Sequence, residues 1–143
     1  MAKPKLLVSL LLIVITAIGF GNAAWLSVKA ELAQVLIKRA WTETLQTGDQ
    51  VRPWQWADTW PVGRMVHPNS NTDLYILEGA QGNALAFGPG RHTNAGELGS
   101  ESSVIGGHKD THFAFLEKVN VGDALQLQTL DGIWHPYRIS AKR

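Results

Sequence analysis

His108 is the residue whose type and position best suit acid–base chemistry in this sequence. It follows two glycines and opens a polar run, so that residues 106–113 read Gly-Gly-His-Lys-Asp-Thr-His-Phe. Residues 103–107 predict a short strand, and the glycines let the chain turn sharply where that strand ends. A strand end holds an imidazole in place, while the following loop leaves it accessible. Because imidazole exchanges protons near neutral pH, His108 is a candidate general acid and base.

A second histidine, His112, stands four residues after His108, a spacing that binds zinc when both residues lie on a helix. His92 would then have to act as the third ligand. The glutamate of a His-Glu-x-x-His motif is absent, and the glycines before His108 disfavour a helix. We therefore expect no metal and no cofactor. His112 is interpreted as a packed residue or as a neighbour that supports His108.

The remaining polar candidates have weaker patterns. Asp110 either orients His108 or forms the turn, and a turn-forming aspartate is the more frequent case. The pair Ser102-Ser103 lacks the Gly-x-Ser-x-Gly context of a nucleophilic serine, so no serine nucleophile is expected. His67 and His135 are interpreted as structural residues.

Strands and turns are predicted for most of the chain after residue 60. Short helical turns are expected at 83–87 and 113–119, an exposed loop at 91–102, and a tight hairpin turn at Asp131-Gly132. Because a small closed barrel takes ~8 strands, about five strands predict an incomplete domain. The predicted strands, which are β-rich or alternate apolar with polar residues, are 61–67, 73–78, 103–107, 124–130 and 133–140.

The first part of the chain predicts a membrane anchor followed by a stalk. Residues 6–24 are mostly apolar and follow Lys3 and Lys5, and about 20 such residues span a bilayer. Flanking lysines stay in the cytoplasm, which sends the rest of the chain outside. A signal peptide cleaved just before Trp25 is the alternative.

Residues 27–46 read as an amphipathic helix that ends near Gly48. The predicted domains are therefore an anchor at 1–26, a stalk helix and Trp-rich linker at 27–57, and a β-domain at 58–143.

The composition excludes several classes of function. Hydrophobic residues make up 45% of the chain and charged residues 17%, which is enough apolar content for a core. The net charge of +1, with scattered basic residues, argues against a nucleic-acid partner. The absence of cysteine excludes disulfides, Cys-ligated zinc and a thiol nucleophile carried by this chain.

Four segments, in order, resemble the sortases of Gram-negative bacteria (class GN). Each segment alone is weak, but the ordered set at this spacing is specific, and the match covers most of the chain. The segments are Asp-Thr-Trp-Pro-Val at 58–62, Leu-Ala-Phe-Gly-Pro-Gly at 85–90, Gly-His-Lys-Asp-Thr-His-Phe at 107–113 and Val-Gly-Asp at 121–123.

This resemblance implies a mainly β fold, a closed antiparallel β-barrel on the periplasmic face of the inner membrane, anchored by a single pass. Sortases cleave a C-terminal sorting signal of a secreted protein. A cysteine thiolate forms a thioester, which an amine acceptor or water resolves. A histidine acts as general acid and base, and an arginine stabilises the oxyanion. The histidine that matches in this chain is His108.

The chain departs from the family pattern after His108. In sortases the cysteine and the arginine lie on later strands, whereas this chain has no cysteine. Arg138 and Arg143 come too early in the order of motifs to be assigned as the oxyanion arginine. We therefore expect the N-terminal part of a sortase barrel that is inactive by itself. The alternative is a non-catalytic, membrane-anchored β-domain that binds a peptide or assists assembly.

Overall fold

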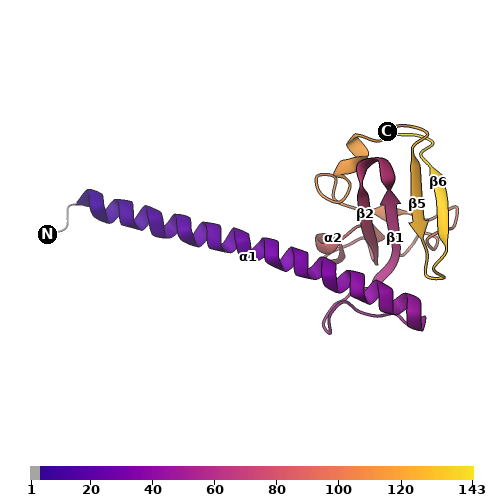
Figure 1. Cartoon of the computed structure of the whole chain (residues 1–143), viewed down its shortest axis with the longest axis horizontal. Coiled ribbons are helices and arrows are strands. Elements are labelled where there is room, and N and C mark those ends of the chain that lie inside the picture. The colour runs from indigo at the N-terminus through magenta and orange to yellow at the C-terminus, as the bar shows by residue number, and fades with distance from the viewer. Residues whose placement is uncertain (1–3) are drawn as a thin grey trace. The chain divides into compact units, whose positions relative to one another are not determined.

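The computed structural model describes residues 4–143, except for the side chains of 4–7, 20–24 and 26. Its elements are one long helix, α1 (Pro4–Thr47), followed by a six-stranded sheet with short helical turns between the strands (Figure 1). Contacts divide the chain into two compact units, 1–33 and 34–143. The second unit contains the sheet and the last turns of α1.

The last turns of α1 belong to the core of the second unit. Ile37, Ala40, Trp41 and Thr44 are all buried and recur at helical spacing, so they form one face. The indole N–H of Trp41 donates a hydrogen bond to Oε1 of Gln128, 3.3 Å away. A separate stalk helix over 27–46 is thus not confirmed, because its second half packs as part of the domain.

The C-terminal end of α1 agrees with the prediction. The helix ends at Thr47. Gly48 follows with φ of 77°, a conformation that glycine adopts without strain. Its N–H donates to the carbonyl of Thr44 at 2.9 Å.

The predicted anchor over 1–26 is not confirmed. Within the part of the chain that the structure describes, no helix has an apolar stretch long enough to cross a bilayer. Part of the predicted anchor, residues 1–3 and the side chains of 4–7, 20–24 and 26, lies outside the described residues.

The first two strands lie where they were predicted, and the structure pairs them as an antiparallel hairpin. Strand β1 (Pro61–His67) pairs with β2 (Thr72–Glu78), and the 3-10 turn η1 (Pro68–Ser70) joins them. Asn71 completes the turn with φ of 51°, which asparagine tolerates better than most residues. The proline after the first run and the β-rich residues of the second predicted the two strands, but not their pairing.

The next two strands are very short. After the helical turn α2 (Ala84–Phe87), strand β3 (Gly90–Arg91) pairs in parallel with β2, and β4 (Ile105–Gly106) pairs antiparallel with β3. No strand was predicted at β3, and its second residue, Arg91, falls in the predicted exposed loop, because a strand of two residues shows no alternation in the sequence. The predicted strand at 103–107 is confirmed in position but is shorter.

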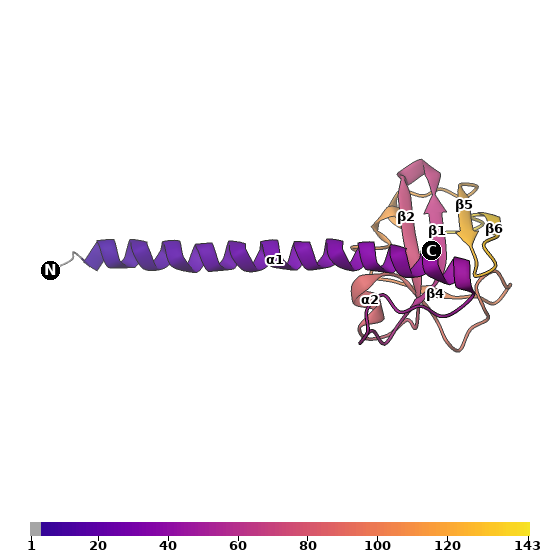
Figure 2. The same cartoon turned by 60° about the horizontal axis from the view of Figure 1, so that its bottom comes forward.

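The last hairpin forms one end of the described sheet. Strand β5 (Ala124–Gln128) pairs with β1, and β6 (Trp134–Arg138) pairs with β5, both antiparallel. The full order is β4-β3-β2-β1-β5-β6, so β4 and β6 are the two edges. Figure 2 shows β2, β1, β5 and β6 in this order. The mainly β prediction is confirmed, in the form of an open six-stranded sheet. The closed barrel itself is not present among residues 4–143.

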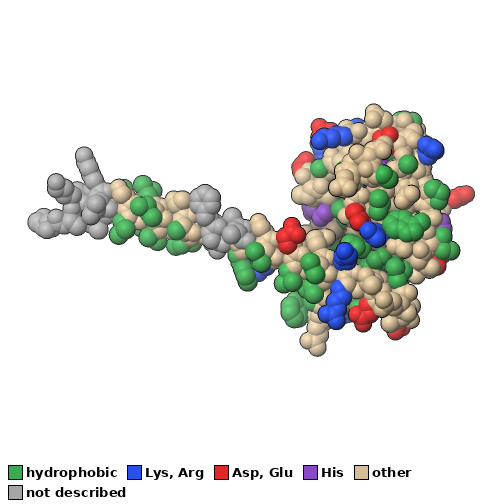
Figure 3. All heavy atoms as spheres, viewed as in Figure 1, with side chains coloured by type: hydrophobic (Ala, Val, Ile, Leu, Met, Phe, Trp, Pro, Cys, Tyr) green, Lys and Arg blue, Asp and Glu red, His purple; other side chains and the backbone are tan. Residues whose placement is uncertain are grey.

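Both faces of the sheet are covered near its centre. Ile76 and Leu77 are neighbours on β2, point to opposite faces, and are each 0% exposed. Ile76 packs with Val62, Met65 and Leu127, whereas Leu77 packs with Ile37 and Ala84. On the visible face of the compact unit, basic and acidic side chains are interspersed (Figure 3), in keeping with the net charge of +1.

Candidate functional site

His108 lies in a tight turn that follows β4. Its imidazole is exposed. Its carbonyl accepts hydrogen bonds from the backbone N–H groups of Thr111 (3.3 Å) and Phe113 (3.1 Å). Immediately after this turn comes the 3-10 turn η2 (Ala114–Glu117). The backbone of the loop is therefore fixed at both ends, while the ring remains accessible.

Gly107 lies close against an aromatic ring. A Cβ at this position would lie 2.9 Å from the nearest ring carbon of Phe113. The ring of Phe113 therefore covers Gly107, the residue immediately before His108. The backbone N–H of Phe113 also donates a hydrogen bond to the carbonyl of His108. Two separate contacts from Phe113 thus hold the turn that presents His108.

His112 is the nearest imidazole neighbour of His108. The ring centroids are 6.5 Å apart, and His112 is half-buried. Burial, and to a smaller extent the neighbouring His108, lowers the pKa of the His112 imidazole. Its Nδ1 atom is buried and has no hydrogen-bond partner. The folded chain therefore favours a neutral His112 beside His108.

The other candidates from the sequence take structural positions. Ser103 donates from Oγ to the carbonyl of Ser100 at 3.0 Å, so it serves its own turn. Asp110 is exposed in the turn after His108. His135 is bonded through Nε2 to the hydroxyl of Thr129, 3.0 Å away.

The zinc alternative finds no support. Across the part of the chain that the structure describes, no three His, Cys, Asp or Glu side chains are grouped so as to hold a metal ion. His92, the ligand that such a site would need, is exposed in the loop between β3 and β4, and its Nε2 would lie 3.3 Å from a Cβ at Gly106.

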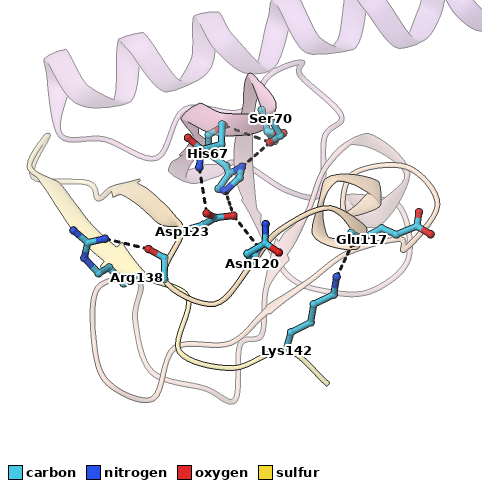
Figure 4. A network of polar contacts seen from close by, with 10 residues as sticks. His67, Ser70, Glu117, Asn120, Asp123, Arg138 and Lys142 are labelled. Carbon is cyan, nitrogen blue, oxygen red and sulfur yellow. Dashed lines mark hydrogen bonds and ion pairs between the residues drawn. The ribbon is translucent and has the colours of Figure 1, made fainter.

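His67 was interpreted as structural, but its contacts are more extensive than that label implies. The imidazole is 2% exposed and lies between Ser70 and Asp123 (Figure 4). Asp123 precedes β5, far along the chain from His67. In the sequence, the only indication of these contacts was a histidine within a mostly apolar strand. Nothing in the sequence identified Ser70 and Asp123 as its partners.

A broad open depression of about 1050 Å³ adjoins the His108 turn. Gly107, Lys109 and Asp110 of that turn line it. Ile105 of β4 and Tyr137 of β6 also line it, so the two edge strands of the sheet border the same space. The other lining residues are mainly apolar side chains of β1, β5 and η2, together with the last residues of the chain.

Comparisons with known proteins identify the family. The family model described as Sortase domain matches residues 65–143, which is more than half of the chain. Comparison with curated proteins finds no significant match.

Solved structures of sortases are similar to this chain. Sortase E from Streptomyces avermitilis is 28% identical with a TM-score of 0.52, and the match covers 57% of this chain and 57% of that one. Sortase A from Corynebacterium diphtheriae is 26% identical with a TM-score of 0.52, covering 62% of this chain and 44% of that one. The match thus spans less than two thirds of either protein.

A Clostridium perfringens sortase D5 transpeptidase has the same fold. Its TM-score is 0.62 at 16% identity, and the match covers 78% of this chain and 73% of that one. This likeness concerns the fold alone, whereas the family model also matches the sequence from Met65, within β1, to the end of the chain. The chain belongs to the sortase family.

Proposed function

We propose that this chain provides the histidine part of a sortase-type cysteine transpeptidase that acts on the C-terminal sorting signals of secreted proteins. The observation that carries the proposal is the position of His108, exposed on a fixed turn after β4 beside the large depression. Family membership supplies the reaction type. The substrate is then a protein with a sorting signal, and the acceptor is an amine or water.

In this proposal His108 moves the protons of two acyl transfers. A cysteine thiolate attacks the scissile carbonyl, and His108 gives a proton to the leaving amine as the thioester forms. The incoming amine or water then attacks the thioester and gives a proton to His108, which restores the thiolate. The lowered pKa of His112 suits this role, because a neutral neighbour adds no repulsion when His108 becomes charged.

The thiolate in this proposal comes from polypeptide other than these 143 residues, because the chain has no cysteine. The two unpaired edges of the described sheet, β4 and β6, border one depression with an apolar floor. Strand edges with free N–H and C=O groups readily accept further strands. A strand pair bearing cysteine and arginine would close the sheet there and bring the thiol toward His108.

Completion of the barrel tests this proposal. The 143-residue chain alone is expected to give no thiol-dependent cleavage of a sorting-signal peptide. A fusion to the late strands of a sortase, which bring a cysteine and an arginine, is expected to cleave it and to lose activity on thiol alkylation. The matched control is the same fusion with the introduced cysteine replaced by alanine. A fusion that folds cooperatively but never forms a thioester would contradict the proposal.

We further propose the Gram-negative class and an inner-membrane location, with the β-domain in the periplasm. The four ordered segments and the apolar residues 6–24 after Lys3 and Lys5 support this. Fractionation of cells expressing the tagged chain is expected to place it in the inner-membrane fraction, with the C-terminal tag accessible to protease only after the outer membrane is opened. Recovery in the soluble fraction would count against the anchor.

A non-catalytic, membrane-anchored β-domain for peptide binding or assembly is the second candidate. The open depression with its apolar floor favours it, because a peptide strand could occupy that space. The fusion experiment separates the two: peptide binding without thioester formation supports the second candidate.

A further inference from the structure

His67 occupies an unusual place for a titratable side chain. It ends β1, is 2% exposed, and belongs to the largest fully buried side chains among the described residues. Buried polar groups are normally retained only where partners satisfy them. The contacts of His67 therefore need an explanation beyond core packing.

Both nitrogens of the His67 ring face polar groups. Nδ1 lies 2.7 Å from Oγ of Ser70, which in turn lies 2.6 Å from Oγ1 of Thr72. Nε2 faces Oδ2 of Asp123 at 3.8 Å, beyond hydrogen-bond distance, and has no hydrogen-bond partner. Figure 4 shows the ring between Ser70 on one side and Asp123 on the other. The imidazole plane is thus directed by the β1–β2 turn and by the turn before β5.

Asp123 is itself held in place. Its Oδ2 accepts the backbone N–H of Asn120 at 2.8 Å, and its Oδ1 accepts the side-chain amide of Asn69 at 3.3 Å. The carboxylate therefore joins the turn after β1 to the turn before β5, with His67 between them. Glu117 and Lys118 line the same hollow, which has a volume of about 710 Å³.

A row of aromatic contacts leads from His67 to the candidate catalytic turn. The ring of His67 lies 5.5 Å from the ring of Phe115 at an interplanar angle of 36°. Phe115 meets Phe113 edge to face at 6.3 Å and 79°. Phe113 in turn covers Gly107 and bonds to the carbonyl of His108. Packed rings transmit position because interiors are close-packed and resist small shifts.

We propose that His67 is a positioning residue for the His108 turn, acting through Phe115 and Phe113 and oriented by Ser70 and Asp123. The inference rests on the proposed role of His108. A histidine suits the position because it is the one residue type that offers a flat ring for Phe115 and two polar atoms for Ser70 and Asp123.

Catalysis by Ser70 itself is not part of this proposal. Ser70, His67 and Asp123 have the residue types of a hydrolase triad, but an oxyanion also needs donors aimed at it. The backbone N–H that follows Ser70, that of Asn71, already donates to the carbonyl of Pro68 at 3.1 Å. Ser70 therefore serves to orient the imidazole.

Nuclear magnetic resonance of the full chain tests the coupling with two readouts. These are the amide exchange rate of Phe113, whose N–H bonds to the carbonyl of His108, and the imidazole resonances of His108. In His67→Gln, which keeps polar atoms but loses the ring, we expect Phe113 exchange to rise about tenfold and the His108 resonances to move. In His67→Phe, which restores the ring but not the two polar atoms that face Ser70 and Asp123, we expect the exchange rate of Phe113 to lie between that of His67→Gln and that of the original chain.

His135→Gln is the matched control, because His135 is also bonded to a hydroxyl but lies on β6. It is expected to leave both readouts unchanged. A cooperatively folded His67→Gln with unchanged Phe113 exchange and His108 resonances would overturn the proposal. So would a His67→Phe variant that behaves like His67→Gln.

If His67→Gln does not fold, Phe115→Leu gives the same test from the next ring in the row. It should move the His108 resonances while the Ser70–His67 contact remains, and unchanged His108 resonances would overturn the proposal. These measurements need no enzymatic activity. If His108 proves dispensable for cleavage in the completed enzyme, the proposed function fails. The coupling of His67 to the His108 turn is still tested independently by the Phe113 exchange rate and the His108 resonances.

Discussion

Replacing His108 by alanine in the fusion that completes the barrel is expected to lower kcat/KM for sorting-signal cleavage by about 10²- to 10⁴-fold. This is the range that positioned proton transfer contributes to catalysis. Without the imidazole, the leaving amine departs unprotonated, and the attacking amine or water loses its proton acceptor. A peptide assay that follows cleavage and thioester formation separately measures the effect.

The control for this change is His92→Ala. His92 is exposed and lies in the loop before β4, so its removal tests whether loss of any neighbouring imidazole matters. It is expected to keep kcat/KM within about twofold, the range of a surface change that leaves the reacting groups in place. A His108→Ala fusion that cleaves as fast as the parent, while remaining folded, would contradict the assignment of His108 as acid and base.

The largest expected effect on stability comes from Gly90→Ala. A Cβ at this residue would lie 2.0 Å from the carbonyl oxygen and 2.8 Å from the carbonyl carbon of Gly79. Both atoms are backbone, so no side-chain rotation relieves the clash, and β3 must move away from the end of β2. We expect a loss of about 1–3 kcal/mol in the free energy of unfolding, measured by urea denaturation with tryptophan fluorescence.

Gly19→Ala is the matched control. Gly19 lies within α1, and a Cβ there would meet nothing within 4 Å. Because alanine is the better helix former, this substitution is expected to leave the urea midpoint unchanged or slightly raised. If Gly90→Ala unfolds at the same urea concentration as the parent, the close approach of β3 to Gly79 does not occur in solution.

Local patterns in the sequence predicted most of the strands. Strands β1 and β2 lie where β-rich residues and the turn after Pro68 predicted them, and the hairpin of β5 and β6 lies where alternation and Asp131-Gly132 predicted it. These signals work because strand alternation and turn chemistry depend on residues only a few positions apart. The candidate His108 was also found locally, from its glycines and the motif around it. Its catalytic role stays a prediction.

Features that join distant segments were missed. Strand β3 has only two residues and exists because β2 and β4 flank it. The last turns of α1 were interpreted as a stalk. Their apolar face predicts that they are buried, but it does not identify the segment that they pack against. The partners of His67 gave no signal, because Asp123 and Phe115 approach it only when β1, β5 and η2 pack together.

The sequence by itself indicated the sortase family and the strand-rich character of the chain, and it singled out His108 as the candidate for proton transfer. Each of these depends on residue types within a short stretch, and the ordered motifs add specificity to it. Only the tertiary structure decided that β4 and β6 border one depression, that Phe113 covers Gly107, and that His67 lies between Ser70 and Asp123. These contacts arise from the packing of segments far apart in the chain, where burial and close packing select the partners.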